Sequence, residues 1–400
     1  MRVTSDSLRA TFLAVLERAN RHLLKTQTQI GTGRRINVPS DDSFAAARIT
    51  EIDAGLSRLA QLRDNGIIAR NRLSLEETVL ADVVDNLQRI RELTLQANSA
   101  TLGNGERAGI AAEIRERFDG VLALANSVDG NGRHLFAGYS ESTQPFVVAG
   151  DGSVQYRGDS GQRFVEINDE RRVAINDSGD AVFQRIPSGN GKFSVAADPG
   201  NTGTGVLGAG TVVDPVAWAA DTGVYRIVFV TPTSYEVRDA ADNPIAAGDH
   251  APGGSIEFLG IGVVLNGSPE TGDTFTVEPS TDRDVFTTLS TLLGRLETPV
   301  AGEADRAALH NTLGQTLVDL DRAIDHMIDL RAGIGARLRA VDDEAASTEA
   351  FEIQMTRELS DLRDLDYAEA ISLLSQQLLQ IDAAQKAFSR TQNLSLFRFL

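Results

Sequence analysis

The sequence predicts an α+β protein in which two long helical flanks form an elongated bundle or coiled coil, with an antiparallel β domain inserted between them. Residues 137–280 hold nine of the eleven prolines and 21 of the 36 glycines, so helix breakers are concentrated in the middle of the chain. Apolar residues recur at helical spacing on both sides of that segment. Within it, short runs rich in Val, Ile, Phe and Tyr alternate with turn sequences, which is typical of antiparallel strands.

Composition narrows the class of protein. The 400 residues carry a net charge of −18, which argues against general nucleic-acid binding. Residues 137–280 contribute 8 basic and 19 acidic side chains, so the predicted β domain is acidic, whereas the first 35 residues hold seven basic side chains and two acidic ones. There is no cysteine, which excludes disulfides, thiolate chemistry and cysteine zinc sites. Neither a membrane span nor a general-secretion leader is expected.

These patterns divide the chain into five expected parts. They are an N-terminal helix segment (1–39), the first half of the bundle (40–136), the β domain (137–281), the second half of the bundle (282–365) and a C-terminal helix segment (366–400). Helices are expected over residues 5–30, 40–98, 106–127 and 285–296, and a last one starts near 304 and continues almost unbroken past 387. Imperfect heptads are formed by Leu73, Leu80 and Leu87 at a and by Val83, Ile90 and Ala97 at d. The β domain is expected to be a compact sandwich or barrel with a glycine-rich excursion near residues 198–211.

The stretch "GRRINVPSDD", residues 33–42, is expected to be a hinge between the first helix and the bundle. Gly33 is a poor helix residue, and Pro39 disfavours helical backbone at the residue before it. Ser40 suits the N-cap of the next helix, and Asp41 and Asp42 complement the positive end of its dipole.

The hinge also groups two basic residues, Arg34 and Arg35, apart from the two acidic residues Asp41 and Asp42. These charges either pair across subunits of an assembly or make the loop soluble. The grouping of like signs favours pairing across subunits, because a merely solvated loop has no need of it.

Both ends of the chain carry an apolar stripe. The N-terminal stripe contains Leu8, Phe12 and Val15, and the C-terminal one contains Leu374, Leu378, Ile381 and Phe388, followed by Leu396 and Phe397. Burying four such side chains contributes ~6–12 kcal/mol, whereas ordering roughly 30 residues costs ~1–2 kcal/mol each for the backbone alone. Either the two helices form a stalk packed against the body, or they stay loose in the monomer and order against neighbouring subunits. These nine residues are the expected assembly contacts.

No catalytic, cofactor or metal site is expected. Residues 203–208 satisfy the G-x-G-x-x-G pattern, but a loop precedes it and a strand follows, whereas a dinucleotide site needs a strand and then a helix. The five histidines are scattered without ligand spacing. The paired acids Asp41–Asp42 and Asp342–Asp343–Glu344 are better explained as a cap and a solvated face, since nothing apolar nearby would raise a carboxyl pKa there.

Three stretches resemble the bacterial flagellin family. They are "QIGTGRRINVPSDD" at the hinge, "NRLSLEETVLADVVDNLQRIRELTLQANSATL" after it, and "LSDLRDLDYAEAISLLSQQLLQIDAAQKAFSRTQNLSLFRFL" at the C-terminus. Within the family, "GNGRHLFAGYSESTQPF" and the closing "SLFRFL" are more similar to the hook-associated subgroup at the hook–filament junction than to flagellin itself. These matches lie at both ends and cover about half of the chain.

The resemblance implies a structural protein of the bacterial flagellum, exported unfolded through the flagellar type III apparatus by an uncleaved N-terminal signal. It implies an export chaperone on the C-terminal helix, self-assembly through the terminal helices, and a place between hook-associated protein 1 and the flagellin filament, outside the cell. The bundle would surround an inner tube of terminal helices, and the β domain would face outward. It implies neither a cofactor nor an enzymatic activity.

Other functions stay open at this point. The near alternative is flagellin, the filament subunit. An enzyme housed in residues 137–280 would need a nucleophile–base–acid or metal spacing that the sequence lacks. An outer-domain adhesin is compatible with an exposed acidic β domain but is not specified by it.

Overall fold

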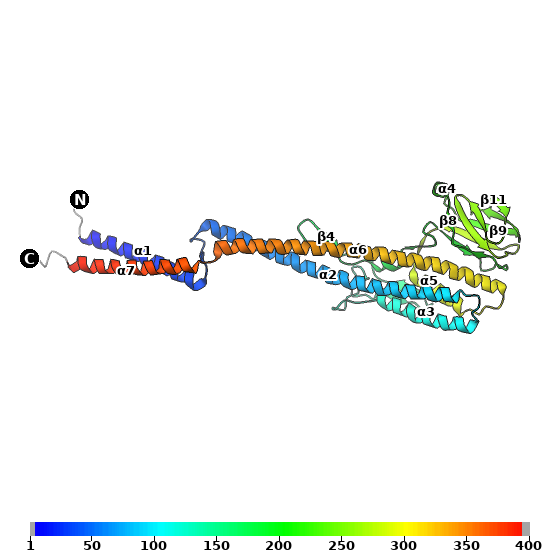
Figure 1. Ribbon diagram of the computed structural model, residues 1–400, viewed down its shortest axis with the longest axis horizontal. Helices are drawn as coiled ribbons and strands as arrows, with labels where there is room; N and C mark the ends of the chain where they lie inside the picture. The colour runs from blue at the N-terminus through cyan, green and yellow to red at the C-terminus, as the bar shows by residue number, and fades with distance from the viewer. Residues whose placement is uncertain (1–4, 394–400) are drawn as a thin grey trace, which may run out of the picture. The chain divides into compact units, whose positions relative to one another are not determined.

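The computed structural model describes the backbone of residues 5–393 and the side chains of residues 9–390. It forms two compact units, which we call the terminal unit (Met1–Asp64 with Asp343–Leu400) and the central unit (Asn65–Asp342). Helices α2 (Ser43–Ala97) and α6 (Glu303–Arg363) contribute residues to both units. The α+β fold class, with helical flanks and an inserted antiparallel β domain, is confirmed (Figure 1).

The remaining long helices are α1 (Ser5–Thr32), α3 (Asn104–Ala125), α5 (Val285–Glu297) and α7 (Tyr367–Asn393). The last helix, predicted to continue almost unbroken past residue 387, is observed as two helices, because residues 364–366 interrupt it between Arg363 and Tyr367. The Asp366 carboxylate accepts hydrogen bonds from the backbone N–H groups of Ala368 (2.9 Å) and Glu369 (3.2 Å). Asp366 is therefore the N-cap that starts α7 as a separate helix.

The N-cap of α2 also differs from the prediction. Ser40 is exposed and lies in a turn, 38–41, that is closed by a backbone hydrogen bond of 2.9 Å before the first helical turn. Asp42 takes the capping role: its side chain accepts the Ala45 N–H at 3.0 Å, and its carbonyl accepts the Ala46 N–H at 2.9 Å. The turn moves the helix start two residues along the chain, to a residue that caps equally well.

The helices of the central unit share one large apolar core. Leu73, Leu80 and Leu87 of α2 are fully buried, as the heptad pattern predicts, and Val83 and Ile90 are buried with them. They pack with apolar residues of α3, α5 and α6. Four aromatic rings with neighbouring centroids 5.2 to 5.8 Å apart complete this core: Phe136, Phe146, Phe183 and Phe286.

Short hairpins after α3 pack into the same helical core. Strand β1 (Phe146–Val148) pairs with β2 (Val154–Tyr156), and β3 (Phe164–Glu166) pairs with β4 (Arg172–Ala174). A π-helix, η1 (Asp180–Gln184), and strand β5 (Ile186–Pro187) follow, and β5 pairs with β15 (Asp282–Arg283). The apolar side chains of this segment, Phe146 and Val173 among them, are part of the core that the helices bury.

A separate antiparallel sandwich extends from β6 to β14. One sheet has the order β11-β10-β9-β14-β6, and the other has the order β12-β13-β7, with β8 also paired to β13. Phe193, Phe229, Phe275 and Trp218 belong to one core that both sheets line. Of the two predicted alternatives, the structure shows the sandwich. The bounds of its elements are β6 (Phe193–Ala197), β7 (Val206–Leu207), β8 (Thr211–Val212), α4 (Pro215–Ala220), β9 (Tyr225–Thr231), β10 (Ser234–Arg238), β11 (Pro244–Asp249), β12 (Gly254–Phe258), β13 (Ile261–Asn266) and β14 (Thr274–Pro279).

The glycine-rich excursion is tied to helix α6. It contains β7 and reaches β8, which both pair with β13. The side chain of Asn311 on α6 accepts the Leu207 N–H at 2.8 Å and donates to the Gly205 carbonyl at 2.9 Å. One amide side chain thus satisfies both a donor and an acceptor of the strand backbone.

Candidate assembly site in the terminal unit

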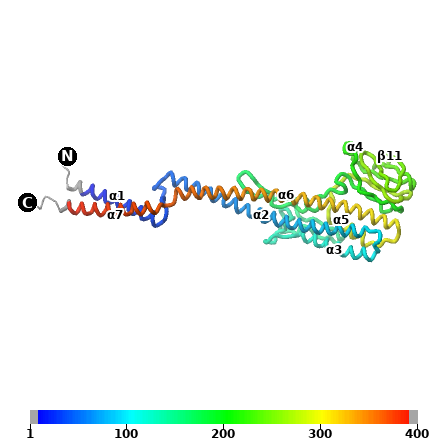
Figure 2. The backbone as a smooth tube through the Cα atoms, in the orientation of Figure 1, coloured from blue at the N-terminus to red at the C-terminus, as the bar shows by residue number. Residues whose placement is uncertain are grey.

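Helices α1 and α7 pack side by side in opposite directions (Figures 1 and 2). Near the start of α1 and the end of α7, the rings of Phe12 and Phe388 stack with centroids 4.1 Å apart and an interplanar angle of 7°. At the opposite end of the pair, the Leu365 N–H donates to the Gly33 carbonyl at 3.0 Å. The apolar stripes predicted at the two chain ends therefore meet each other.

The pair covers only part of its own apolar surface. Among the predicted assembly residues, Ile381 is buried, while Phe12, Leu374 and Phe388 are half-buried. These four side chains lie in the seam between the helices or at its edge. Contact with one partner helix is thus enough to bury a narrow stripe and no more.

Other predicted assembly residues stay in solvent. Val15 and Leu378 are each 50% exposed. Leu8 belongs to α1, but its side chain is outside the described part, and Leu396 and Phe397 lie outside the described residues altogether. That Val15 and Leu378 contact other subunits therefore stays a prediction.

Further exposed apolar residues extend this surface beyond the predicted set. They are Leu13 (46% exposed), Leu24 (61%), Ile371 (53%), Leu373 (43%) and Leu379 (70%). The Leu-Leu pairs at 373–374 and 378–379 were the available signal: adjacent helical residues point about 100° apart, so one partner helix cannot cover both. We call Leu13, Val15, Leu24, Ile371, Leu373, Leu378 and Leu379 the open stripe.

The hinge is paired to the linker between α6 and α7. The Arg35 N–H donates to the Arg363 carbonyl at 2.8 Å, and with the Leu365 contact to Gly33 this makes an antiparallel bridge between Arg34 and Asp364. No sequence pattern indicates this pairing, because each strand of the bridge is only a few residues long. The end of α1 and the start of α7 therefore meet at one hydrogen-bonded point.

Gly33 and Arg35 fix the geometry of this bridge. Gly33 has φ +70°, and a Cβ there would lie 2.9 Å from the Tyr367 hydroxyl oxygen, so a glycine fits both the backbone angle and the space. The Arg35 guanidinium donates to the Leu362 carbonyl from Nε (3.2 Å) and Nη2 (2.9 Å). The Gln29 amide donates to the Arg35 carbonyl at 2.5 Å, which connects α1 to the same point.

Asp41 organises the rest of the hinge. Its carboxylate accepts the backbone N–H groups of Asn37 (3.0 Å) and Val38 (3.2 Å) and pairs with the Lys25 ammonium at 3.0 Å. The hydrogen bond from Lys25, followed by that from the Asn37 N–H, holds the pKa of Asp41 below its ordinary value. Within the chain Asp41 thus pairs with Lys25 on α1, while Pro39 stays exposed in the turn.

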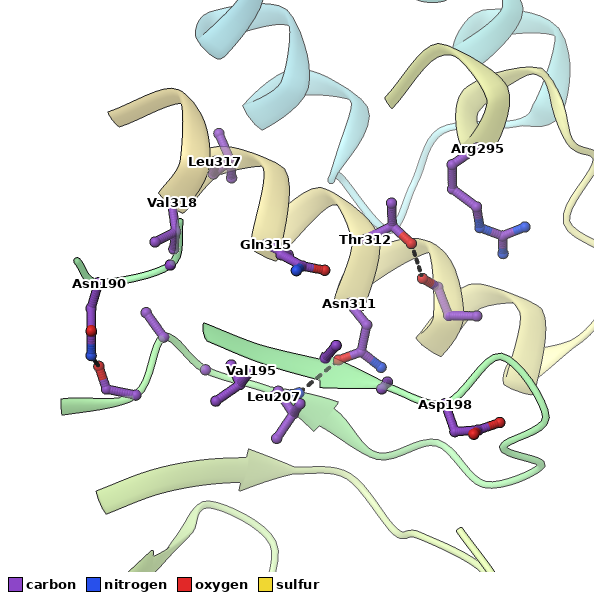
Figure 3. A pocket seen from close by; sticks show the side chains of 18 of the residues that line it. Asn190, Val195, Asp198, Leu207, Arg295, Asn311, Thr312, Gln315, Leu317 and Val318 are labelled. Carbon is purple, nitrogen blue, oxygen red and sulfur yellow. Dashed lines mark hydrogen bonds between the residues drawn. The ribbon is translucent and has the colours of Figure 1, made fainter. Parts of the chain in front are cut away.

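A groove lies elsewhere, in the central unit, between the β6–β8 region and α6 (Figure 3). It has a volume of about 620 Å³, and its lining includes Asn190, Val195, Leu207, Asn311 and Gln315. The lining residues include neither histidine nor serine. Among the described residues, no group of three His, Asp or Glu side chains is placed to hold a metal ion.

No described helix combines the length and the apolar character that crossing a bilayer requires.

Comparison with known proteins gives family matches at both ends of the chain. Residues 5–141 match the bacterial flagellin N-terminal helical region, and residues 317–400 match the bacterial flagellin C-terminal helical region. Flagellar hook-associated protein 3 of Escherichia coli strain K12 is 26% identical over 94% of this chain and 92% of its own. Flagellin of the same strain is 31% identical but matches only 27% of this chain.

Solved structures give the same result. The crystal structure of Xanthomonas campestris FlgL is 33% identical, with a TM-score of 0.73, over 77% of this chain and 99% of that one. The flagellar junction protein FlgL from Legionella pneumophila is 28% identical, with a TM-score of 0.72, over 79% of this chain and 99% of that one. The junction proteins thus match more than three quarters of this chain, whereas flagellin of strain K12 matches 27% of it.

Proposed function

Since this chain belongs to the bacterial flagellin family and is similar throughout to hook-associated protein 3, we propose that its paired terminal helices join subunits at the hook–filament junction. The protein is a structural component of the bacterial flagellum. Its part in assembly is argued from the terminal unit, which matches both family regions.

The open stripe is the observation that carries this proposal. Seven large apolar side chains of α1 and α7 are 43% to 70% exposed while the two helices already contact each other. Apolar surface of this extent on a helix pair marks a protein–protein contact, because each side chain gains free energy when a neighbour removes it from water. A ring or helical layer of like subunits supplies such neighbours on both sides of every pair.

We propose hook-associated protein 1 and flagellin as the partners on the two faces of the layer, with other copies of this chain as lateral neighbours. The support is the names of the relatives, flagellar hook-associated protein 3 and the flagellar junction protein FlgL. We also propose that a flagellar export chaperone binds the C-terminal helix before export. It would cover the exposed leucines of the open stripe until assembly does so. The extracellular flagellum is then the proposed location.

Complementation tests the proposal. A flagellated bacterium that lacks its own hook-associated protein 3 would receive the full chain, the double variant Leu378→Ser/Leu379→Ser, or the control Gln376→Ser, which changes an exposed polar position of the same helix. We expect filaments on hooks and swimming with the full chain and the control. The double variant should be exported to the medium but should leave hooks without filaments.

Two outcomes would count against the proposal. Normal filaments with the double variant would show that the open stripe is not the assembly surface. Long filaments formed by the purified chain alone would instead favour the flagellin alternative, because a junction protein on its own should remain unpolymerised. Comparing the medium with the hook fraction separates loss of export from loss of incorporation.

A further inference from the structure

A buried polar junction connects three elements in the central unit. Residues 176–178, which follow β4, are nearly inaccessible to solvent, with exposed fractions of 0% to 6%. The Asp177 N–H donates to the Glu76 carboxyl on α2 at 3.0 Å, and the Arg337 guanidinium on α6 pairs with the Asp177 carboxylate. Gln162 donates to the other Asp177 oxygen at 2.8 Å. The junction thus ties the β3–β4 region to both long helices.

The charges at this junction do not balance if both acids are ionised. Glu76 is 1% exposed, its second oxygen has no hydrogen-bond partner in the described structure, and the Asp177 carboxyl group is its acidic neighbour. Arg337 faces the pair from α6, but its guanidinium is bound to Asp177 and to the Ala174 carbonyl (3.3 Å). One guanidinium therefore faces two carboxyl groups.

The other nearby cation is already engaged. Arg72 lies one helical turn before Glu76 on α2, and its guanidinium pairs with Glu141 at 2.7 Å and with Asp129 at 3.4 Å. A buried carboxylate without its own cation costs several kcal/mol, whereas the neutral acid does not carry that cost.

We propose that Glu76 is held as a neutral carboxylic acid that anchors the Asp177 backbone to α2, and that its ionisation loosens this junction. This site is a pH-sensitive contact that holds residues 176–178 against α2, and no described residue of the terminal helices takes part in it. Burial, and then the negative charge of Asp177, raise the pKa of Glu76 to about 8 from an ordinary value of 4.5. The hydrogen bond from the Asp177 N–H and the charges of Arg337 and Arg72 oppose this rise without cancelling it.

The sign of the pH dependence follows from proton counting. Between pH 4.5 and about 8 the closed junction holds one proton that the open, solvated junction has lost. The closed state is therefore fully favoured below pH 4.5 and is weakened as pH rises to about 8, above which the effect levels off. The equilibrium constant for opening rises by up to tenfold per pH unit in this window.

The test compares Glu76→Gln with Glu77→Gln in the full chain. Glutamine reproduces the neutral acid at position 76, while Glu77 is a half-exposed neighbour that pairs with Arg331 at 2.7 Å. Amide exchange of residues 176–178 would be followed from pH 5 to 8 and divided at each pH by the exchange rate of an unstructured peptide of the same sequence, so that the intrinsic pH dependence of exchange is removed. We expect opening to rise toward tenfold per pH unit in the wild type and in Glu77→Gln, and to stay flat in Glu76→Gln.

A second measurement keeps the inference testable if the exchange is too slow to follow. The infrared difference between wild type and Glu76→Gln at pH 6 should contain the C=O band of one protonated carboxyl group. The inference is overturned if that band is absent, or if opening in Glu76→Gln depends on pH as it does in Glu77→Gln.

Discussion

The ring of Phe12, near the start of the described chain, lies flat against the ring of Phe388, near its end, with centroids 4.1 Å apart. The two residues are both only half-buried, so the stack holds the two ends together while leaving one side of the contact open. Sequence alone left two alternatives for the ends, a packed stalk or loose tails. In the structure α1 packs against α7, and the side of this helix pair that faces solvent remains apolar.

Phe388→Ala should weaken this pair. The stack contributes about 0.5–1.5 kcal/mol beyond the apolar area that it buries, so α1 and α7 should lose at least about 1 kcal/mol of local stability. Amide exchange along α1 measures that loss. Leu379→Ala is the matched control, because its side chain is 70% exposed and its truncation should change the pair by less than about 0.5 kcal/mol. Equal exchange in the two variants would contradict the stack as a stabilising contact.

Gly33→Ala and Gly31→Ala should act in opposite directions. At Gly33, with φ +70°, an alanine costs roughly 1–2 kcal/mol and also meets the Tyr367 hydroxyl. At Gly31, inside α1, no atom lies within 4 Å of the added Cβ, so alanine should stabilise the helix by roughly 0.5–1 kcal/mol. Thermal unfolding of α1, followed by circular dichroism, would show a lowered and a raised midpoint. Two midpoint shifts of the same sign would refute the assigned turn.

Asp366→Ala should destabilise the start of α7 by about 0.5–2 kcal/mol, because two backbone N–H groups lose their acceptor. Asp42→Ala should do the same to α2. Ser40→Ala is expected to be neutral, since Ser40 is in the preceding turn. Amide exchange in the first turn of each helix distinguishes the three variants, and a large effect of Ser40→Ala would restore Ser40 as the cap.

Acid should loosen the hinge through Asp41. Its pKa is held below the ordinary value of 3.8, mainly by the hydrogen bond from Lys25, so its contribution to stability is present above that value and is lost as pH falls through the folded-state pKa. Lys25→Met should raise the pKa of Asp41 toward 3.8. A carboxyl-carbon NMR titration of both chains measures the two values. An unchanged midpoint in the variant would mean that the backbone donors alone set it.

The helical architecture could be predicted because it depends on local pattern. The buried a and d positions from Leu73 to Ile90 repeat over several turns of α2, and the concentration of Pro and Gly delimits the β insert. The cap at Asp366 also had a local signal, since "DLDYAE" places aspartate just before a helix, but the apolar periodicity on both sides concealed the interruption.

Features that depend on distant partners could not be predicted in the same way. Neither helix sequence indicates whether Phe12 contacts Phe388 or a neighbouring subunit. The bridge at Arg34 has no strand-like run, and the ion pair of Asp41 joins it to Lys25 on another element rather than to the arginines beside it. Glu76 falls at a d position of the heptads, but that position does not reveal which loop covers it.

The bridge between the hinge and the α6–α7 linker has a consequence for the order of folding. Arg35 and Leu362 are hydrogen-bonded although 327 positions separate them in sequence. Closing so long a loop carries an entropic cost, so contacts of this kind form after local ones, and here only after about nine tenths of the chain has been synthesised. Until then the leucines of α1 have no partner within the molecule. The nascent chain therefore exposes the leucines of α1 during most of its synthesis. Binding by a chaperone, or early delivery to the export apparatus, has its greatest effect in this interval.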